Sequence, residues 1–178
     1  MEIAAAQRNM ALSYAGGAPG VLVSGLVWMA AGIIWQQSDV ARAFLVLFIG
    51  GMIIFPASVL IARLILRAPK ISAGNPLERL GLETTFMLFG GILIAWLLLR
   101  PAPDLVFPVM AITIGVRYFA FRTLYADPLY WVLGVLLASA GALAALGVAV
   151  LPTNIAIIAG GIEIGFAIML FARRNRLG

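Results

Sequence analysis

The sequence predicts an all-α integral membrane protein, a polytopic bundle of about six transmembrane helices with both termini in the cytoplasm. Hydrophobic residues make up 63% of the 178 residues and charged residues only 11%, whereas about a quarter of a soluble domain is charged. The mean hydropathy is +1.09, a value that favours lipid as the solvent of the surface. The few charges also leave long apolar segments between them, and a membrane-spanning helix needs about 20 such residues.

Charged and turn-forming residues predict where these helices end. The polar segment RLILRAPKISAGNPLER at 63–79 separates the second helix from the third, and RPAPD at 100–104 separates the third from the fourth. Asp127 and Pro128 close the fourth helix, and LPTN at 151–154 breaks the last apolar region. The predicted helices form a single membrane domain over residues 1–178 and lie at about 19–36, 42–64, 80–99, 105–125, 128–150 and 154–172.

Residues 1–15 precede the first long apolar segment and have two alternative interpretations. A few apolar side chains among small and polar ones favour a short helix that lies along the inner membrane interface. The apolar face of this helix is weak. The alternative is therefore a frayed tail that leads into Gly16 and Gly17.

The distribution of basic residues predicts the orientation, because Lys and Arg in short loops are retained on the cytoplasmic side. With the N-terminus inside, only Arg42 and Arg100 of the twelve basic residues lie outside. This bias also accounts for the net charge of +5, with anionic lipids of the inner leaflet as counter-charge and without a nucleic-acid partner. We expect a multi-pass protein of the cell membrane, specifically of a prokaryotic cytoplasmic membrane.

The composition also limits the chemistry of the protein. The chain has no Cys and no His, which excludes disulfides, thiol nucleophiles, imidazole bases and the commonest zinc ligands. Its seven Asp and Glu residues do not cluster at metal-ligand spacing, and no nucleotide-binding or nucleophile-elbow motif is present. We therefore expect no metal and no cofactor, and a membrane enzyme is the least favoured class.

Ionisable residues within the predicted spans are the strongest functional candidates, because a charge at the bilayer centre costs at least about 2.5 kcal/mol. Glu163 lies about 12 Å into the helix at 154–172, and Arg117 about 18 Å into the helix at 105–125. An arginine side chain spans this difference, so we predict an ion pair between Glu163 and Arg117. The alternatives are that Arg117 extends to the inner headgroups and that Glu163 is protonated and hydrogen-bonded to a neighbouring helix.

Two further charges are weaker candidates for a polar site. Glu83 is expected in the first turn of the helix at 80–99, where a carboxylate complements the helix dipole. The functional alternative is that Glu83, Arg79 and Arg122 line an inner vestibule.

Glycine and proline residues predict contacts and bends within the bundle. Pairs of glycines on three predicted helices should let those helices pack closely, or alternatively line a narrow path along the backbone. Pro56 and Pro108 should kink their helices and are candidate hinges. The candidate packing glycines are Gly50, Gly51, Gly90, Gly91, Gly160, Gly161 and Gly165.

Two function classes fit this pattern best. The first is a channel or transporter for a small solute, ion or proton that uses the buried carboxylate of Glu163. The second is a non-catalytic membrane protein, such as a stress-response or assembly subunit, in which Glu163 is a structural polar contact. The expected partners are the lipid bilayer and an unidentified small solute, and a homo-oligomer is an alternative to a monomer.

Overall fold

The computed structural model describes residues 2–148 and 151–174, the last without its side chain. Of the described residues, 83% are helical and none lies in a strand. The α-helices are α1 (Ile3–Ser13), α2 (Ala18–Gln37), α3 (Val40–Leu60), α4 (Leu77–Leu98), α5 (Val106–Tyr125), α6 (Leu129–Ala145) and α7 (Ile155–Arg174). Short 3₁₀ turns, η1 (Ala15–Gly17) and η3 (Pro103–Leu105), precede α2 and α5, and the π-helical turn η2 (Ile61–Ile65) extends α3.

Helices α2 to α7 match the six predicted spans, and five of the six are long and apolar enough to cross a membrane. The exception is α6, an apolar helix of only 17 residues that ends before the predicted limit at residue 150. Gly147 stops this helix because it adopts a left-handed backbone with φ of 63°, and the amide of Val148 then bonds back to the carbonyl of Leu143. Residues 149 and 150 lie outside the described residues.

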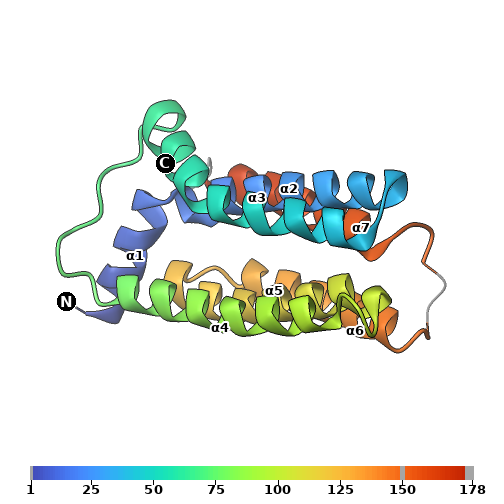
Figure 1. The fold of residues 1–178 in the computed structure, drawn as a ribbon. Helices are drawn as coiled ribbons and strands as arrows, with labels where there is room; N and C mark the ends of the chain where they lie inside the picture. The colour runs from blue at the N-terminus through green and yellow to red at the C-terminus, as the bar shows by residue number, and fades with distance from the viewer. Residues whose placement is uncertain (1, 149–150, 175–178) are drawn as a thin grey trace.

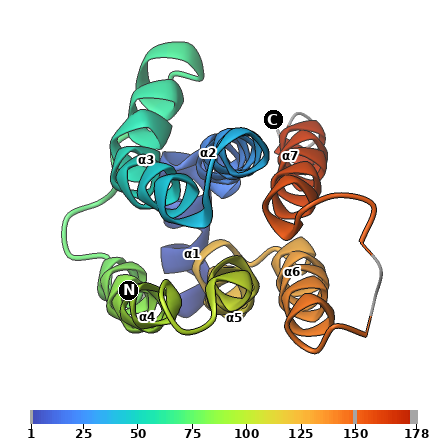
Figure 2. The same cartoon turned by 45° about the vertical axis from the view of Figure 1, so that its right-hand side comes forward.

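The six long helices form two layers (Figures 1 and 2). In one layer α2 lies between α3 and α7, and in the other α5 lies between α4 and α6. Helix α1 crosses one end of the bundle and packs against α5 and α4, and α7 finishes at the same end (Figure 1). We call this the α1 end and the other the far end. An even number of spans places both chain ends on one side, as predicted, while the cytoplasmic location of that side stays a prediction.

Residues 3–13 form helix α1, so the alternative of a frayed tail is wrong. The helix is held by the long polar loop between α3 and α4 and by the end of α5. The Nδ2 atom of Asn75 donates hydrogen bonds to the carbonyl of Ala6 and to Oδ1 of Asn9, both at 3.0 Å. The Nε2 atom of Gln7 donates to the carbonyl of Thr123 at 2.8 Å.

Two pairs of glycines bring helix backbones into contact within the layers. A Cβ atom on Gly25 of α2 would lie 3.0 Å from the carbonyl oxygen of Gly160 of α7. A Cβ atom on Gly115 of α5 would lie 2.9 Å from the carbonyl oxygen of Gly134 of α6. Because these sites leave no room for a side chain, each glycine pair fixes how its two helices pack.

The predicted packing glycines are only partly at helix contacts. Gly50 lies against Val27 and Gly91 against Thr113, so these contacts join α3 to α2 and α4 to α5. The prediction that α3, α4 and α7 pack on one another is therefore wrong, because α2 and α5 lie between the outer helices. A Cβ atom on the remaining predicted glycines would have no neighbouring atom within 4 Å among the described residues. These are Gly51, Gly90, Gly161 and Gly165.

The two predicted hinge prolines differ in position. Pro56 lies inside α3, and the end of this helix with η2 bends away from the bundle (Figure 1). Pro108 is the third residue of α5. The amide groups of the first turn have no hydrogen-bond partner within the helix, so a proline there removes no hydrogen bond. The prediction that Pro108 kinks its helix by removing a hydrogen bond is therefore wrong. Instead, its carbonyl oxygen lies 2.7 Å from the position that a Cβ atom on Gly141 of α6 would take.

Candidate functional site

The carboxyl group of Glu163 forms the centre of the candidate site. Glu163 lies near the middle of α7, on a face that also carries Ala159 and Ala167, and all three side chains are fully buried. These small neighbours one turn away on each side allow α2 and α5 to approach the carboxyl group. The site is therefore enclosed by protein and lies at the boundary between the two layers.

The two carboxyl oxygens of Glu163 have different surroundings. Oε1 accepts a hydrogen bond of 2.7 Å from the hydroxyl group of Tyr118 on α5. Oε2 is buried and has no hydrogen-bond partner, although Ser24 of α2 places its hydroxyl group beside the same carboxyl group. A buried oxygen without a donor is costly for a carboxylate, whereas a proton on the carboxyl group removes the charge.

The predicted ion pair between Glu163 and Arg117 does not form. The Nε atom of Arg117 lies 3.3 Å from Oγ1 of Thr84, and its Nη2 atom 3.4 Å from Oγ1 of Thr85, both on α4. The guanidinium group also lies over the ring of Phe121, 5.1 Å from its centroid. Arg117 thus faces α4 while the next residue along α5 faces α7, and its effect on Glu163 is an electrostatic interaction without contact.

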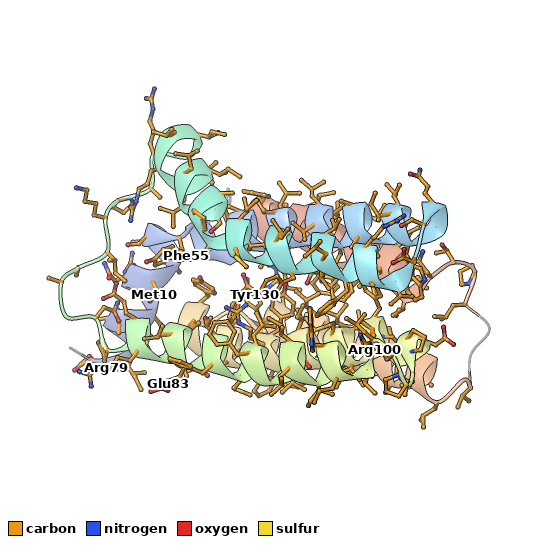
Figure 3. The ribbon with its side chains drawn as sticks, in the orientation of Figure 1. Met10, Phe55, Arg79, Glu83, Arg100 and Tyr130 are labelled. Atoms are coloured by element: carbon orange, nitrogen blue, oxygen red, sulfur yellow. The ribbon has the colours of Figure 1, made fainter. Side chains whose placement is uncertain are left out.

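The vestibule predicted from Glu83, Arg79 and Arg122 is not assembled in the structure. Helix α4 begins at Leu77, so Glu83 lies in its second turn, and its side chain points away from the bundle (Figure 3). Arg122 instead lies over the ring of Trp131 of α6, 5.7 Å from its centroid. Arg79 and Glu83 are exposed on α4, whereas Arg122 lies on α5 against α6, so the three charges do not form a common site.

Aromatic rings fill the space between Glu163 and the α1 end. The ring of Tyr130 on α6 stacks on that of Tyr118 with a centroid distance of 5.9 Å, and lies 5.5 Å from that of Tyr125. Phe121 contacts all three of these rings edge-on. Because α5 contributes its members at intervals of three and four residues, the cluster lies along one face of that helix.

The turn η1 closes this cluster at the α1 end. The hydroxyl group of Tyr130 donates a hydrogen bond of 2.6 Å to the carbonyl of Gly16. Gly17 adopts a φ of 78°, and a Cβ atom there would lie 2.3 Å from the Tyr130 hydroxyl oxygen. Glycine is therefore required both by the backbone conformation and by the close approach of the ring.

Tyr14 lies at the outer edge of the same region, just before η1. Its ring is 6.3 Å from that of Phe55 on α3. Partial burial raises the pKa of Tyr14, the nearby carboxylate of Glu78 raises it further, and Arg63 acts in the opposite direction. The Tyr14 hydroxyl group therefore keeps its proton at neutral pH and can donate a hydrogen bond.

Aromatic residues also lie between Glu163 and the far end, but they are almost entirely apolar. Trp35 stacks on Phe107 with a centroid distance of 4.7 Å, and Trp28 lies 6.0 Å from the same ring. The Nε1 atom of Trp28 is buried without a hydrogen-bond partner. Beyond this stack, Trp35 lines an open pocket of about 290 Å³ that also includes Asp104.

Sequence reasoning missed several residues of this site. Tyr118 and Ser24 were not candidates, because a hydroxyl group in an apolar helix is common and carries no charge. One signal was available, since all four tyrosines of the chain fall in segments that end at the same side of the predicted bundle. Within the described ranges, no group of three acidic side chains lies close enough to hold a metal ion.

Comparison with known proteins adds a family to this description. No curated protein and no solved structure matches the sequence. The profile of a family of unknown function, DUF7010, matches residues 3–173, from α1 into the last turn of α7. The match thus includes Glu163, Tyr118 and Arg117. The chain belongs to this family, DUF7010.

Proposed function

We propose that this protein is a membrane transporter or channel that moves protons, alone or with a small solute, and that Glu163 binds the proton. The observation that carries the proposal is the carboxyl group of Glu163, fully buried, with Oε2 lacking a hydrogen-bond donor. In an apolar bundle such a group exists at low cost when protonated and at higher cost when ionised. Intramembrane carboxyl groups of this kind are typical of proton pathways.

The surroundings of Glu163 support reversible binding of a proton. The Tyr118 hydroxyl group stabilises an ionised carboxylate through its hydrogen bond, and the positive charge of Arg117 acts in the same direction from a distance. Neither group forms a salt bridge that would hold Glu163 permanently ionised. The two protonation states are therefore closer in free energy than burial alone would make them.

The position of Glu163 between the layers supports a transport cycle. The hydrogen bond from Tyr118 joins α5 of one layer to α7 of the other. Transporters commonly bind their substrate at the interface between two helical units near the bilayer midplane, and the units then move against each other. A change in protonation of Glu163 alters this contact and thereby links proton binding to the relative position of the layers.

The test is proton flux into liposomes that contain the purified protein, followed with a trapped pH-sensitive dye after an imposed pH difference. Glu163→Gln should abolish the flux while the protein remains folded, because the amide keeps the shape of the side chain but cannot exchange a proton. Glu83→Gln is the matched control, since its carboxylate points away from the bundle, and should leave the flux unchanged. Equal flux in wild type and Glu163→Gln would contradict the proposal.

An assembly or stress-response subunit without transport is the second candidate. The buried Tyr118–Glu163 hydrogen bond favours it, because a bond between two layers also serves a purely structural role. In that case wild-type liposomes hold the imposed pH difference, and Glu163→Gln lowers the stability of the protein without any change in flux.

A further inference from the structure

All four tyrosines of the chain lie on one side of Glu163, between it and the α1 end. Tyr118 bonds directly to the carboxyl group, Tyr130 and Tyr125 follow, and Tyr14 stands at the edge of the bundle. Tyrosine hydroxyl groups both donate and accept hydrogen bonds, so a series of them can pass protons.

Each tyrosine in this series interacts with the next one. The rings of Tyr118 and Tyr130 are stacked, and the rings of Tyr130 and Tyr125 lie 5.5 Å apart. Tyr125 and Tyr14 are close enough to interact electrostatically, and Tyr14 interacts in turn with Glu78 and Arg63. The series therefore runs from the centre of the bundle to charged groups at the α1 end.

An unsatisfied polar atom lies near each end of the series. Oε2 of Glu163 is buried without a partner at the inner end, and so is Oγ of Ser13, the residue before Tyr14, at the outer end. Buried polar atoms of this kind are the usual binding positions of internal water molecules. Water at these positions would supply hydrogen-bond partners at both ends of the series.

Among the described residues, the other side of Glu163 has no comparable series of tyrosine hydroxyl groups. The stacked rings of Trp35, Phe107 and Trp28 lie between the far end and the site. The indole Nε1 of Trp28 is able to donate a hydrogen bond but cannot accept one, so it cannot receive a proton and pass it on.

We infer that Glu163 exchanges its proton with the α1 end, through the hydroxyl groups of Tyr118, Tyr130, Tyr125 and Tyr14 and intervening water molecules. This inference rests on the proposed function and specifies the route of the proton. As the Tyr118 O–H bond breaks, its proton forms an O–H bond to Oε1 of Glu163, and the Tyr118 oxygen receives a proton from the next water or hydroxyl group. Each oxygen gains one proton for the one it gives, and no redox partner is needed.

The charged and titratable groups around Glu163 agree with this direction. Arg117, on the face of α5 toward α4, interacts with Glu163, Tyr118 and Tyr125 electrostatically. Its positive charge lies beside the series. It therefore favours a tyrosine oxygen that has transiently lost its proton over one that carries an extra proton. Ser24, from α2, adds a hydroxyl group at the carboxyl group itself.

The test is the rate at which Glu163 is protonated after a rapid drop in pH, measured on the full chain in liposomes. The readout is the infrared carbonyl band of the protonated carboxyl group, assigned by its loss in Glu163→Gln. Tyr118→Phe and Tyr125→Phe should each slow this rate about tenfold, the change in rate that corresponds to one hydrogen bond of ordinary net strength. Tyr125→Phe keeps the ring contacts and guards against a folding defect in Tyr118→Phe.

Two controls address the route. Thr113→Val removes a hydroxyl group of α5 that bonds only to Val109 of its own helix among the described contacts, and Trp28→Phe removes the polar atom on the far side. Both should leave the rate unchanged. Unchanged rates in both tyrosine variants, or a slower rate confined to Trp28→Phe, would overturn the inference.

The outcome is separable from that of the flux experiment. Abolished flux in Glu163→Gln with normal protonation rates in both tyrosine variants supports the proposed function and overturns the route. Slower protonation in the tyrosine variants without any flux in the wild type supports the route and overturns transport.

Discussion

Tyr118 and Glu163 connect the two layers of the bundle through a buried hydrogen bond of 2.7 Å. Tyr118→Phe removes the donor and leaves both carboxyl oxygens of Glu163 without a hydrogen bond. We expect the free energy of unfolding to fall by about 1–3 kcal/mol, the cost of an unsatisfied buried polar group. Unfolding by denaturant in mixed micelles measures this change. Thr113→Val is the control. If Thr113→Val lowers the free energy of unfolding as much as Tyr118→Phe does, the bond between Tyr118 and Glu163 has no special role.

The contact between Gly25 and Gly160 should be intolerant of even a methyl group. A Cβ atom on Gly25 would lie 2.8 Å from Cγ1 of Ile164 and 3.0 Å from the carbonyl oxygen of Gly160. Gly25→Ala should therefore lower the free energy of unfolding by about 1–3 kcal/mol, as overpacking does elsewhere. Gly161→Ala is the matched control, because nothing lies within 4 Å of its Cβ position, and should change stability by less than about 0.5 kcal/mol. Equal effects of the two substitutions would refute this packing.

The ends of most helices could be predicted from the sequence, whereas the partners of each helix could not. Charges are expensive inside a bilayer, and clusters of charged residues with Pro or Gly mark turns, so these clusters reveal where a span stops. Hydrophobic periodicity, which identifies the buried face of a soluble helix, is weak here because lipid and protein neighbours both favour apolar side chains. As a result, Gly160 and its neighbour Gly161 looked equivalent in the sequence, although one contacts α2 and the other contacts nothing.

The same limit explains the error at the candidate site. The rise of 1.5 Å per residue gives the depth of a side chain, and it placed Glu163 near the middle of the bundle. The direction of a side chain changes by about 100° at each residue, and no sequence pattern determined this direction. Tyr118 therefore faces Glu163, and Arg117, one residue earlier, faces Thr84.

The contacts of Arg117 predict that its replacement has a small effect on the free energy of unfolding. Its partners are the hydroxyl groups of Thr84 and Thr85, at 3.3 and 3.4 Å, and both hydroxyl groups also bond to the carbonyl of Gly81. Arg117→Met should therefore change the free energy of unfolding by less than about 1 kcal/mol. Loss of one partner of a buried ion pair would instead cost about 3–5 kcal/mol. A loss of that size in denaturant unfolding would revive the ion pair with Glu163.

The docking of α1 should depend on one buried amide. Asn75 is 3% exposed, and its Oδ1 atom accepts a hydrogen bond from the amide of Leu77 while its Nδ2 atom holds α1. Asn75→Ala should speed amide hydrogen exchange throughout residues 3–13, because the loss of these bonds frees α1 from the loop. Ser72→Ala is the control, since its side-chain bond to Asn9 is exposed. Unchanged exchange in Asn75→Ala would show that the apolar face of α1 and the bond from Gln7 to Thr123 hold the helix without Asn75.

The absence of cysteine from the sequence makes the predicted orientation directly testable. Ser38 lies at the far end between α2 and α3, and Ala73 lies in the loop at the α1 end, both with exposed side chains. Because nine of the eleven basic residues that the structure describes lie toward the α1 end, that end should be cytoplasmic. In intact cells a membrane-impermeant maleimide should label Ser38→Cys but not Ala73→Cys, and permeabilised cells should show both labelled. The reverse labelling pattern would show that the protein has the opposite orientation in the membrane. The tyrosine series would then open to the outside.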